Sequence, residues 1–287
     1  MGILVIGGTG RVGNPSVQSL VDRGEDVHVL TRSEKKAGSL PSTAKGIIGD
    51  LENADTLDSA FDGVDTLFLI TANGETEVDR GVNAVNAAVA AKVQKIVFLS
   101  VVIPENIQVP HYESKKPIEK AIRQSGAIYT FIRPNFFFQN DLLLGQVIMN
   151  YGLYTMPVGN VGQNRIDARD IADAAVRALT TSDLDNTDIR LHGPETLTAD
   201  RVSSIYSKHL GKEVKYAGDN LDAWATASEA FMPAWLINAL RLGFENMQTN
   251  GGIGSATEVA ASRDAVGHNL RRFEDFVVEA VAAWQNS

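Results

Sequence analysis

The sequence contains no cysteine, and this absence removes several kinds of chemistry at once. Disulfide bonds, cysteine-ligated metal sites and thiol catalysis all need a sulfhydryl group, so none of them is open to this chain. The histidines are also few, and they lack the short spacing of metal ligands, since they stand at positions 28, 111, 192, 209 and 268. We therefore expect no metal site.

The sequence also lacks long apolar runs and clusters of basic charge. No hydrophobic stretch reaches the ~20 residues that a membrane-spanning helix needs. The 26 Lys and Arg residues are dispersed along a chain with a formal charge of −9, whereas a nucleic-acid-binding face needs clustered cations. The N-terminus shows no signal-peptide pattern. We expect a cytoplasmic protein that binds neither nucleic acid nor membrane, and both a monomer and a homodimer remain open.

Strand-like and helix-like segments alternate through the first half of the chain. The apolar, β-branched segments predict strands at 3–6, 26–31, 46–49, 65–70, 95–101 and 129–133. Between them, apolar periodicity predicts helices at 11–23, 54–61, 75–91 and 111–125, and a short helical turn is expected at 33–38. This alternation builds a parallel sheet with helices on both faces. The predicted fold class is α/β, a doubly wound Rossmann-type sheet.

The second half of the chain breaks this rhythm. Helices are expected at 135–150, 168–179, 221–247 and 273–284, with a Gly- and Pro-rich loop at 151–163. We expect residues 1–150 to form an NAD(P)-binding domain, with part of 160–192 packing back on it. Residues 151–287 should form a smaller, mostly helical region that binds substrate or acts as a lid.

A glycine-rich turn follows the first predicted strand and opens the first predicted helix. Residues 7–13 read Gly-Gly-Thr-Gly-Arg-Val-Gly. Glycine permits the tight turn and lets the backbone approach a pyrophosphate, while the helix N-terminus offers free N–H groups and a positive dipole. The pattern predicts a dinucleotide site formed by Gly7, Thr9, Gly10, Arg11, Val12 and Gly13.

The segment after the second predicted strand indicates which dinucleotide is bound. NAD sites place an Asp or Glu there for the ribose hydroxyls, but this chain has Thr31-Arg32-Ser33, with Lys36 close behind. A guanidinium pairs with phosphate through two parallel hydrogen bonds. We therefore expect Arg32 and Lys36 to favour NADP(H), with NAD(H) possible. The adenine should lie near Asp50 and Leu51, and the nicotinamide end near Thr71, Ala72 and Asn73.

These segments, taken together, resemble the NmrA-like branch of the atypical short-chain dehydrogenase/reductases. The resemblance rests on 7–13, 31–32 with Lys36, 49–51, 96–100, 131–136 with Asn140, and 167–172. It implies relatives among NADPH-dependent quinone, azo-dye and triphenylmethane-dye reductases, isoflavone-type reductases and redox-sensing regulators. It also implies that Pro134, Asn135 and Phe136 lie beside the nicotinamide. Ser100 stands at the carboxyl end of the fifth predicted strand, and the alternatives for it are contact with the nicotinamide, contact with the substrate, or capping of the strand.

In the extended members of that family, one helix carries the motif Tyr-x-x-x-Lys. Residues 111–119 read His-Tyr-Glu-Ser-Lys-Lys-Pro-Ile-Glu, which fits the motif in two registers. One pairs His111 with Lys115 and keeps the family's serine and glutamate; the other pairs Tyr112 with Lys116. The isoflavone-reductase branch has its functional lysine where Lys115 falls, so Lys115 and His111 are the candidate catalytic residues. The imidazole titrates near neutrality and can act as acid or base.

Aromatic side chains occur in the segment after the sixth predicted strand and in the helical stretch predicted at 221–247. Candidate pocket residues are Phe137, Phe138, Trp224, Phe231 and Trp235, although their helical spacing also fits core packing. The sequence thus predicts an NAD(P)H-dependent reductase that passes hydride to a small aromatic or conjugated acceptor, such as a quinone, enone, azo compound or cationic dye. The alternatives are a non-catalytic NADP(H)-binding redox sensor and a tailoring enzyme for an aromatic polyketide-like substrate.

Overall fold

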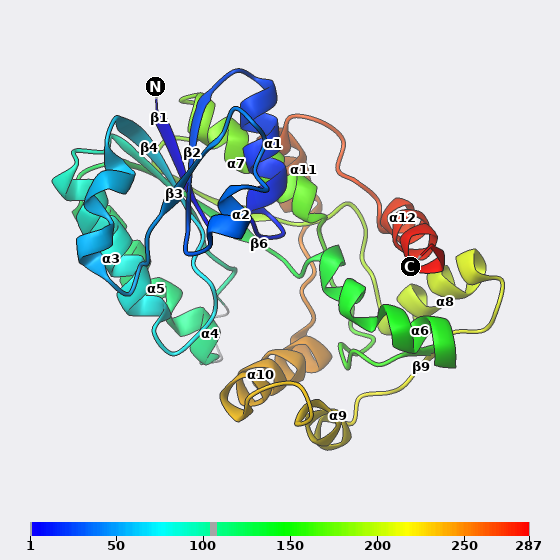
Figure 1. The fold of residues 1–287 in the computed structure, drawn as a ribbon. Helices are drawn as coiled ribbons and strands as arrows, with labels where there is room; N and C mark the ends of the chain where they lie inside the picture. Colours follow the sequence, from blue (N-terminus) through cyan, green and yellow to red (C-terminus); the bar gives the residue numbers. More distant parts are fainter. Residues whose placement is uncertain (1, 104–107, 287) are drawn as a thin grey trace.

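The computed structural model describes residues 2–103 and 108–286, and its central feature is a parallel sheet (Figure 1). The strands lie in the order β3-β2-β1-β4-β5-β6-β8. Their bounds are β1 Gly2–Ile6, β2 Asp26–Thr31, β3 Lys45–Ile48, β4 Val64–Leu69, β5 Lys95–Leu99, β6 Ile128–Pro134 and β8 Thr187–Leu191. The strand order reverses between β1 and β4, and ligands bind beyond the carboxyl ends of the strands at such a point. The predicted α/β fold class is confirmed.

Helices cover both faces of the sheet, as Figure 1 shows. One face carries α1 (Gly13–Asp22), α7 (Ala168–Thr180) and α11 (Ala256–Val266). The opposite face carries α3 (Glu77–Ala90) and α5 (Lys115–Gln124). The central strands are therefore buried on both sides, which accounts for their nearly continuous apolar sequence.

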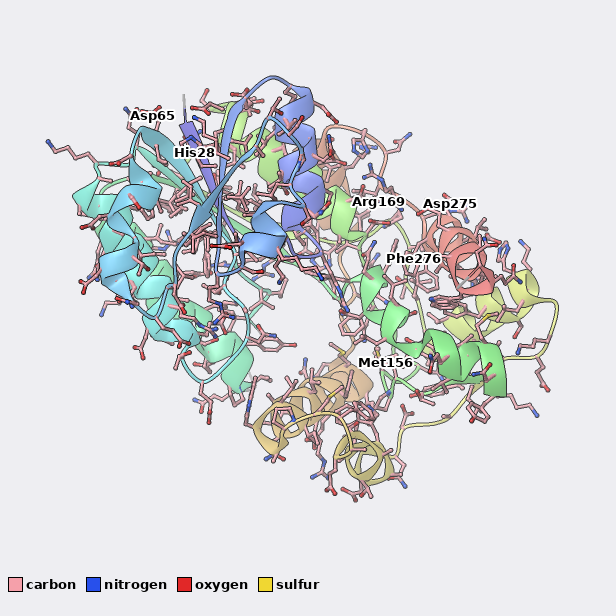
Figure 2. The ribbon with its side chains drawn as sticks, viewed as in Figure 1. His28, Asp65, Met156, Arg169, Asp275 and Phe276 are labelled. Atoms are coloured by element: carbon pink, nitrogen blue, oxygen red, sulfur yellow. The ribbon has the colours of Figure 1, made fainter. Side chains whose placement is uncertain are left out.

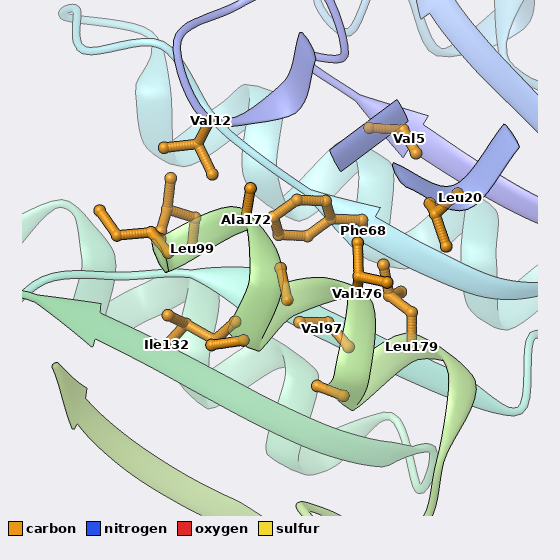
Figure 3. Close-up of a cluster of buried hydrophobic side chains, with 14 of the residues drawn as sticks. Val5, Val12, Leu20, Phe68, Val97, Leu99, Ile132, Ala172, Val176 and Leu179 are labelled. Carbon is orange, nitrogen blue, oxygen red and sulfur yellow. The ribbon is translucent and has the colours of Figure 1, made fainter. Parts of the chain in front are cut away.

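The core between the sheet and α7 depends on small residues in the helix. Figure 3 shows Phe68, Val97 and Ile132 of the strands close to Ala172 and Val176 of α7, and all five side chains are buried. Alanines let the helix approach the sheet closely, so the strand side chains fill the space between them. Burying one side chain of this size contributes about 1.5–3 kcal/mol to stability.

A second region, which we call the helical lobe, stands beside the carboxyl edge of the sheet (Figure 1). Its elements are η3 Phe138–Leu144, α6 Gly145–Tyr151, β7 Leu153–Tyr154, α8 Ala199–Leu210, β9 Lys215–Tyr216, α9 Leu221–Ser228, α10 Ala234–Asn250 and α12 Phe273–Gln285. Strands β7 and β9 pair in parallel. Figure 2 shows Met156 and Phe276 within this lobe, and both side chains belong to its apolar core. No helix in the described ranges is long and apolar enough to cross a membrane.

Several predicted elements differ from the observed ones. The strand β8 and the helices α8 and α11 were not predicted. The expected helix 54–61 is two short 3₁₀ turns, η1 Ala54–Thr56 and η2 Asp58–Phe61. The short helical turn expected at 33–38 is observed as α2 Glu34–Ala37. Strand β8 lacks a continuous apolar run because it is an edge strand with only Ile189 and Leu191 buried.

Three expected helices are interrupted or shortened in the structure. The helix predicted at 111–125 divides at Ser114 into α4 (Pro110–Glu113) and α5. The stretch predicted at 221–247 divides before Pro233, which caps α10, because proline cannot donate the backbone hydrogen bond that a continuous helix needs. The helix predicted at 135–150 is shortened, because residues 135–137 continue from the end of β6 and are not helical. Its remainder is the 3₁₀ segment η3 and the helix α6.

Candidate functional site

The glycine-rich turn joins β1 to α1 at the switch point of the sheet. Gly7 has a φ of 80°, which side-chain-bearing residues rarely adopt. A Cβ atom on Gly13 would lie only 2.2 Å from the carbonyl oxygen of Gly7. The helix can therefore begin this close to the turn only because residue 13 is glycine.

The turn leaves backbone donors open at the start of α1. The N-cap residue, Val12, makes no side-chain capping bond. The N–H groups of Arg11 and Val12 have no acceptor within residues 2–103 and 108–286. Uncapped N–H groups at the positive end of a helix dipole attract anions. The turn therefore fits the diphosphate of a dinucleotide. From the same turn, the Arg11 guanidinium donates to Asn140 Oδ1 (2.9 Å) and so reaches the helical lobe.

Two cations stand beyond β2, where a 2′-phosphate would lie. The Arg32 side chain is 70% exposed, and its charged partner, Asp50, is 3.9 Å away. Lys36 is exposed in the last turn of α2. The Asp50 carboxylate also accepts the N–H of Glu52 (3.1 Å), which fixes the loop after β3 beside Leu51. An exposed guanidinium with one distant partner has donors to spare for a phosphate.

Lys115 lies at the carboxyl edge of the sheet in a buried network. Only 5% of its side chain is exposed, and its Nζ donates to Glu77 Oε1 (2.5 Å) and Thr71 Oγ1 (3.0 Å). Thr71 follows β4 and itself donates to Glu77 (2.6 Å), whereas the neighbouring Ala72 and Asn73 are exposed. Burial lowers the pKa of Lys115, although attraction to Glu77 acts in the opposite direction.

The structure distinguishes the environments of the two lysines that the sequence left as alternatives. Lys116 points to the surface and pairs with Glu113 (2.7 Å), with about half of its side chain exposed. Burial raises the pKa of Tyr112, and a Cβ on Gly243 of α10 would lie 3.7 Å from its hydroxyl oxygen. The backbone of His111 belongs to α4, but its side chain lies outside the described part of the molecule. Lys115 thus has the buried position at the sheet edge, and its role stays a prediction.

Ser100, at the end of β5, is tied to α5. Its hydroxyl donates to Glu119 Oε1 (2.6 Å), and Arg133 of β6 binds the same carboxylate through two donors (3.1 and 2.7 Å). The hydroxyl proton of Ser100 is therefore committed to α5, and only its oxygen lone pairs remain for a ligand.

The segment after β6 is fixed by hydrogen bonds of Asn135. Asn135 donates to Gly252 O (2.7 Å) and accepts the N–H of Phe136 (2.7 Å). Pro134 is buried at the end of β6. Phe136 and Phe137 are half-buried, but Phe138 is fully buried in the core of the helical lobe. The prediction that Phe138 lines a pocket is therefore wrong, because its ring packs against the lobe's own aromatic residues Phe273 and Phe276.

The aromatic residues of α9 and α10 take different positions. Trp224 packs edge-on against Phe244, with ring centroids 5.0 Å apart, so it joins the two helices. Phe231 is 70% exposed and Trp235 is 37% exposed. These two rings remain candidates for contact with a substrate.

A buried ion pair in the helical lobe was missed entirely. Arg165 donates to Asp141 Oδ1 (2.6 Å), Tyr154 (3.2 Å) and the carbonyl of Phe137 (3.4 Å). Its guanidinium also lies over the ring of Phe136, 5.2 Å from the centroid. The pair therefore holds the segment that follows β6. The sequence offers no local sign of it, because the partners lie 24 residues apart.

One acidic cluster has the composition of a metal site. Asp170, Asp173 and His268 bring ligand atoms within 4.8 Å of one another. The guanidinium of Arg271 already binds both carboxylates there. The cluster therefore has its own cation and is accounted for as a structural ion pair.

Comparison with known proteins places these observations in a family. The model of the NmrA-like family matches residues 1–276. An NAD(P)H azoreductase of Xenophilus azovorans is 32% identical over 245 residues, which cover 83% of this chain and 84% of that protein. The (4-alkanoyl-5-oxo-2,5-dihydrofuran-3-yl)methyl phosphate reductase of Streptomyces griseus is 31% identical, with 98% and 99% of the two chains covered.

The fold is shared with solved structures. The NADPH complex of quinone oxidoreductase QOR2 from Escherichia coli superimposes with a TM-score of 0.87 at 22% identity, covering 96% of this chain and 99% of that one. Structural homologues thus bind NADP(H), and homologues by sequence are NAD(P)H-dependent oxidoreductases. The resemblance inferred from the sequence is confirmed: the chain belongs to the NmrA-like family.

Proposed function

We propose that this chain is an NADPH-dependent reductase that transfers hydride to a flat conjugated acceptor. The observation that carries the proposal is a convergence at one edge of the sheet. The open N–H groups at Arg11 and Val12 lie at the end of β1, and the Lys115 ammonium lies beside the end of the adjacent β4. Backbone N–H groups suited to a diphosphate and the buried ammonium of Lys115 therefore lie at the same edge of the sheet.

The cofactor would be held by parts of the chain that follow three neighbouring strands. The turn 7–13 would bind the diphosphate, and Arg32 and Lys36 would bind the 2′-phosphate. The loop at Asp50 and Leu51 would flank the adenine. When bound, NADPH supplies a hydride from its nicotinamide ring. The protein's part is to orient the ring and acceptor and to exclude water between them.

The chemistry of the two relatives supports a conjugated acceptor. One carries the name of an azoreductase, and the other is named for a 5-oxo-2,5-dihydrofuran substrate, whose ring contains a conjugated carbonyl. Exposed aromatic surface at Phe231 and Trp235, with half-buried Phe136 and Phe137 on the sheet side, would suit a flat molecule.

The test is NADPH oxidation, followed at the nicotinamide absorbance band, against quinones, enones, azo compounds and cationic dyes. Turnover with any of these flat acceptors, faster with NADPH than with NADH, is the expected result. Binding of NADPH without turnover across the whole panel would overturn the reductase proposal and favour the redox sensor.

A further inference from the structure

Glu77, at the start of α3, is a buried carboxylate that the proposed hydride transfer does not itself require. It is 1% exposed and sits in the first turn of the helix that follows β4. Its Oε1 accepts from Lys115 (2.5 Å) and Thr71 (2.6 Å), and its Oε2 accepts from the Ser114 hydroxyl (2.7 Å). Both oxygens are therefore engaged, and the carboxylate has a fixed position.

The geometry around Lys115 leaves one donor open. An ammonium group has three N–H bonds, and two of them are taken by Glu77 and Thr71. Within the described ranges, no other residue accepts a hydrogen bond from Nζ. The ring of Phe98 lies beneath it, with its centroid 5.5 Å away. The third N–H is thus available to a ligand at the carboxyl edge of the sheet.

The charge of this ammonium depends on Glu77. Burial lowers the pKa of Lys115, and the nearby Arg80 lowers it further. Glu77 raises the pKa by attraction and by its hydrogen bond, and Glu119 adds a smaller attraction. Without Glu77, the pKa of Lys115 would be lower still, because burial and Arg80 would act without the opposing attraction of that carboxylate.

We propose that Glu77 is a positioning residue that presents Lys115 as a charged donor to a carbonyl oxygen, so that the site prefers conjugated carbonyl acceptors to cationic dyes. This inference rests on the proposed reductase function. It adds the class of acceptor and the residue that selects it.

The electron balance of the transfer explains the preference. Hydride from NADPH forms a C–H bond at the electron-poor carbon of an enone or quinone, NADP⁺ remains, and the displaced π pair moves to the carbonyl oxygen. That oxyanion accepts a hydrogen bond from the Lys115 ammonium, and a proton from water then completes the reduction. A fixed donor aimed at developing charge lowers the barrier. A cationic dye accepts hydride and becomes neutral, so it forms no oxyanion and meets repulsion from the ammonium.

The test compares two acceptors and two lysine–glutamate pairs. Glu77→Gln and Lys115→Met alter the buried pair, while Glu113→Gln and Lys116→Met alter the surface pair next to it and serve as matched controls. For each protein, kcat and KM are measured with menadione and with malachite green. The pH dependence of menadione reduction is also recorded.

We expect Glu77→Gln to lower the ratio of menadione to malachite green turnover at least tenfold, mainly through kcat, and Lys115→Met to lower it by about 100-fold. In Glu77→Gln, the alkaline loss of menadione turnover should begin at lower pH, because the ammonium has lost the carboxylate that favours its charged form. The surface variants should leave the ratio unchanged.

Equal losses of turnover with both acceptors in Glu77→Gln would mean that Glu77 has only a structural role. Unchanged turnover with both acceptors would also overturn the proposal. Failure of the reductase function itself has a different signature, since the unaltered protein would then reduce neither acceptor. NMR titration of the lysine Cε resonances needs no turnover. The Lys115 signal, assigned with Lys115→Met, should titrate at lower pH in Glu77→Gln than in the unaltered protein. The same titration in both proteins would refute the influence of Glu77 on Lys115.

Discussion

The two halves of the molecule each bury a cation against a carboxylate, but they complete the pairs differently. In the helical lobe, Arg165 and Asp141 are enclosed within a core, at 1% and 0% side-chain exposure. At the sheet edge, Lys115 and Glu77 are almost as buried, at 5% and 1%. Burial alone therefore does not separate a structural pair from a functional one.

The difference lies in where the unused donor is, because Arg165 Nε also has no hydrogen-bond partner among the described residues but is buried in the lobe. Asp141 accepts from Arg165, Tyr154 (3.3 Å) and Tyr206 (3.2 Å), and the Arg165 guanidinium also lies over the ring of Phe273. The pair is surrounded by protein on all of these sides. Lys115 instead keeps one N–H open at the edge where ligands bind. A buried charge that is enclosed organises a fold, whereas one with an open donor is placed to meet a ligand.

The largest effect should come from breaking the enclosed pair. Asp141→Asn leaves the Arg165 charge buried without its partner, which should lower the free energy of unfolding by about 3–5 kcal/mol. Urea denaturation measures this change. Asp222→Asn, which breaks the exposed pair with Arg241, is the matched control and should change stability by less than about 1 kcal/mol. Equal effects would remove the distinction between enclosed and exposed pairs.

A smaller loss should follow from breaking the edge pair. Lys115→Met leaves the buried Glu77 carboxylate without its cation, but the hydroxyls of Thr71 and Ser114 still donate to it. The free energy of unfolding should therefore fall by about 2–3 kcal/mol. The double variant Lys115→Met/Glu77→Met should recover most of that stability, because an apolar pair avoids desolvating two charges. It should not recover menadione reduction. If activity returned with stability, the edge pair would be structural as well.

Next in size is the exposed cation Arg32 of the proposed cofactor site. Arg32→Ala should weaken NADPH binding at least tenfold, since a hydrogen bond to a charged group contributes about 1.5–3 kcal/mol. NADH binding should barely change, because NADH lacks the 2′-phosphate. Lys35→Ala, in the short helix α2 that follows Arg32, is the control. Titration calorimetry gives both affinities, and equal losses for the two cofactors would refute the assignment of Arg32 to the 2′-phosphate.

The smallest effect should be a pH dependence at an exposed pair. When protonated, His268 donates from Nδ1 to the backbone carbonyl of Asn269 and from Nε2 to Asp173, and these contacts raise its pKa above the ordinary 6.5. A raised pKa means that the native state favours the imidazolium. Its contribution is therefore complete below pH 6.5 and is lost as the pH rises through the raised value. With 43% of the side chain exposed, solvent screening keeps it below about 1 kcal/mol. Urea midpoints of His268→Asn should lack this decline.

The parts of the site that could be predicted are those encoded over short distances in the chain. Gly7 and Arg32 directly follow strands, and Gly13 begins the first helix a few residues after β1, so these residues are placed by their neighbours in sequence. The family motif favoured Lys115 over Lys116, and the structure places only Lys115 at the buried edge. The assignments of these residues to the cofactor and to catalysis remain predictions.

The parts that could not be predicted depend on contacts between distant segments. Glu77 meets Lys115 across 38 residues, and in the sequence it is one of several acidic residues near a helix start. Phe138 has the same composition around it as Phe137, yet one ring enters the core and the other does not. An apolar pattern shows that a side chain will be covered but does not show whether protein or ligand will cover it.

The buried Lys115–Glu77 pair also has a consequence for the inheritance of this sequence. A lineage that lost either residue alone would carry an unmatched charge in a dry site, and would be less stable than both its ancestor and the double replacement. Positions 77 and 115 should therefore coevolve, so that both residues are kept or both are replaced. A branch of the family with an apolar residue at both positions would have changed the acceptors it can reduce, even where its glycine-rich turn is intact.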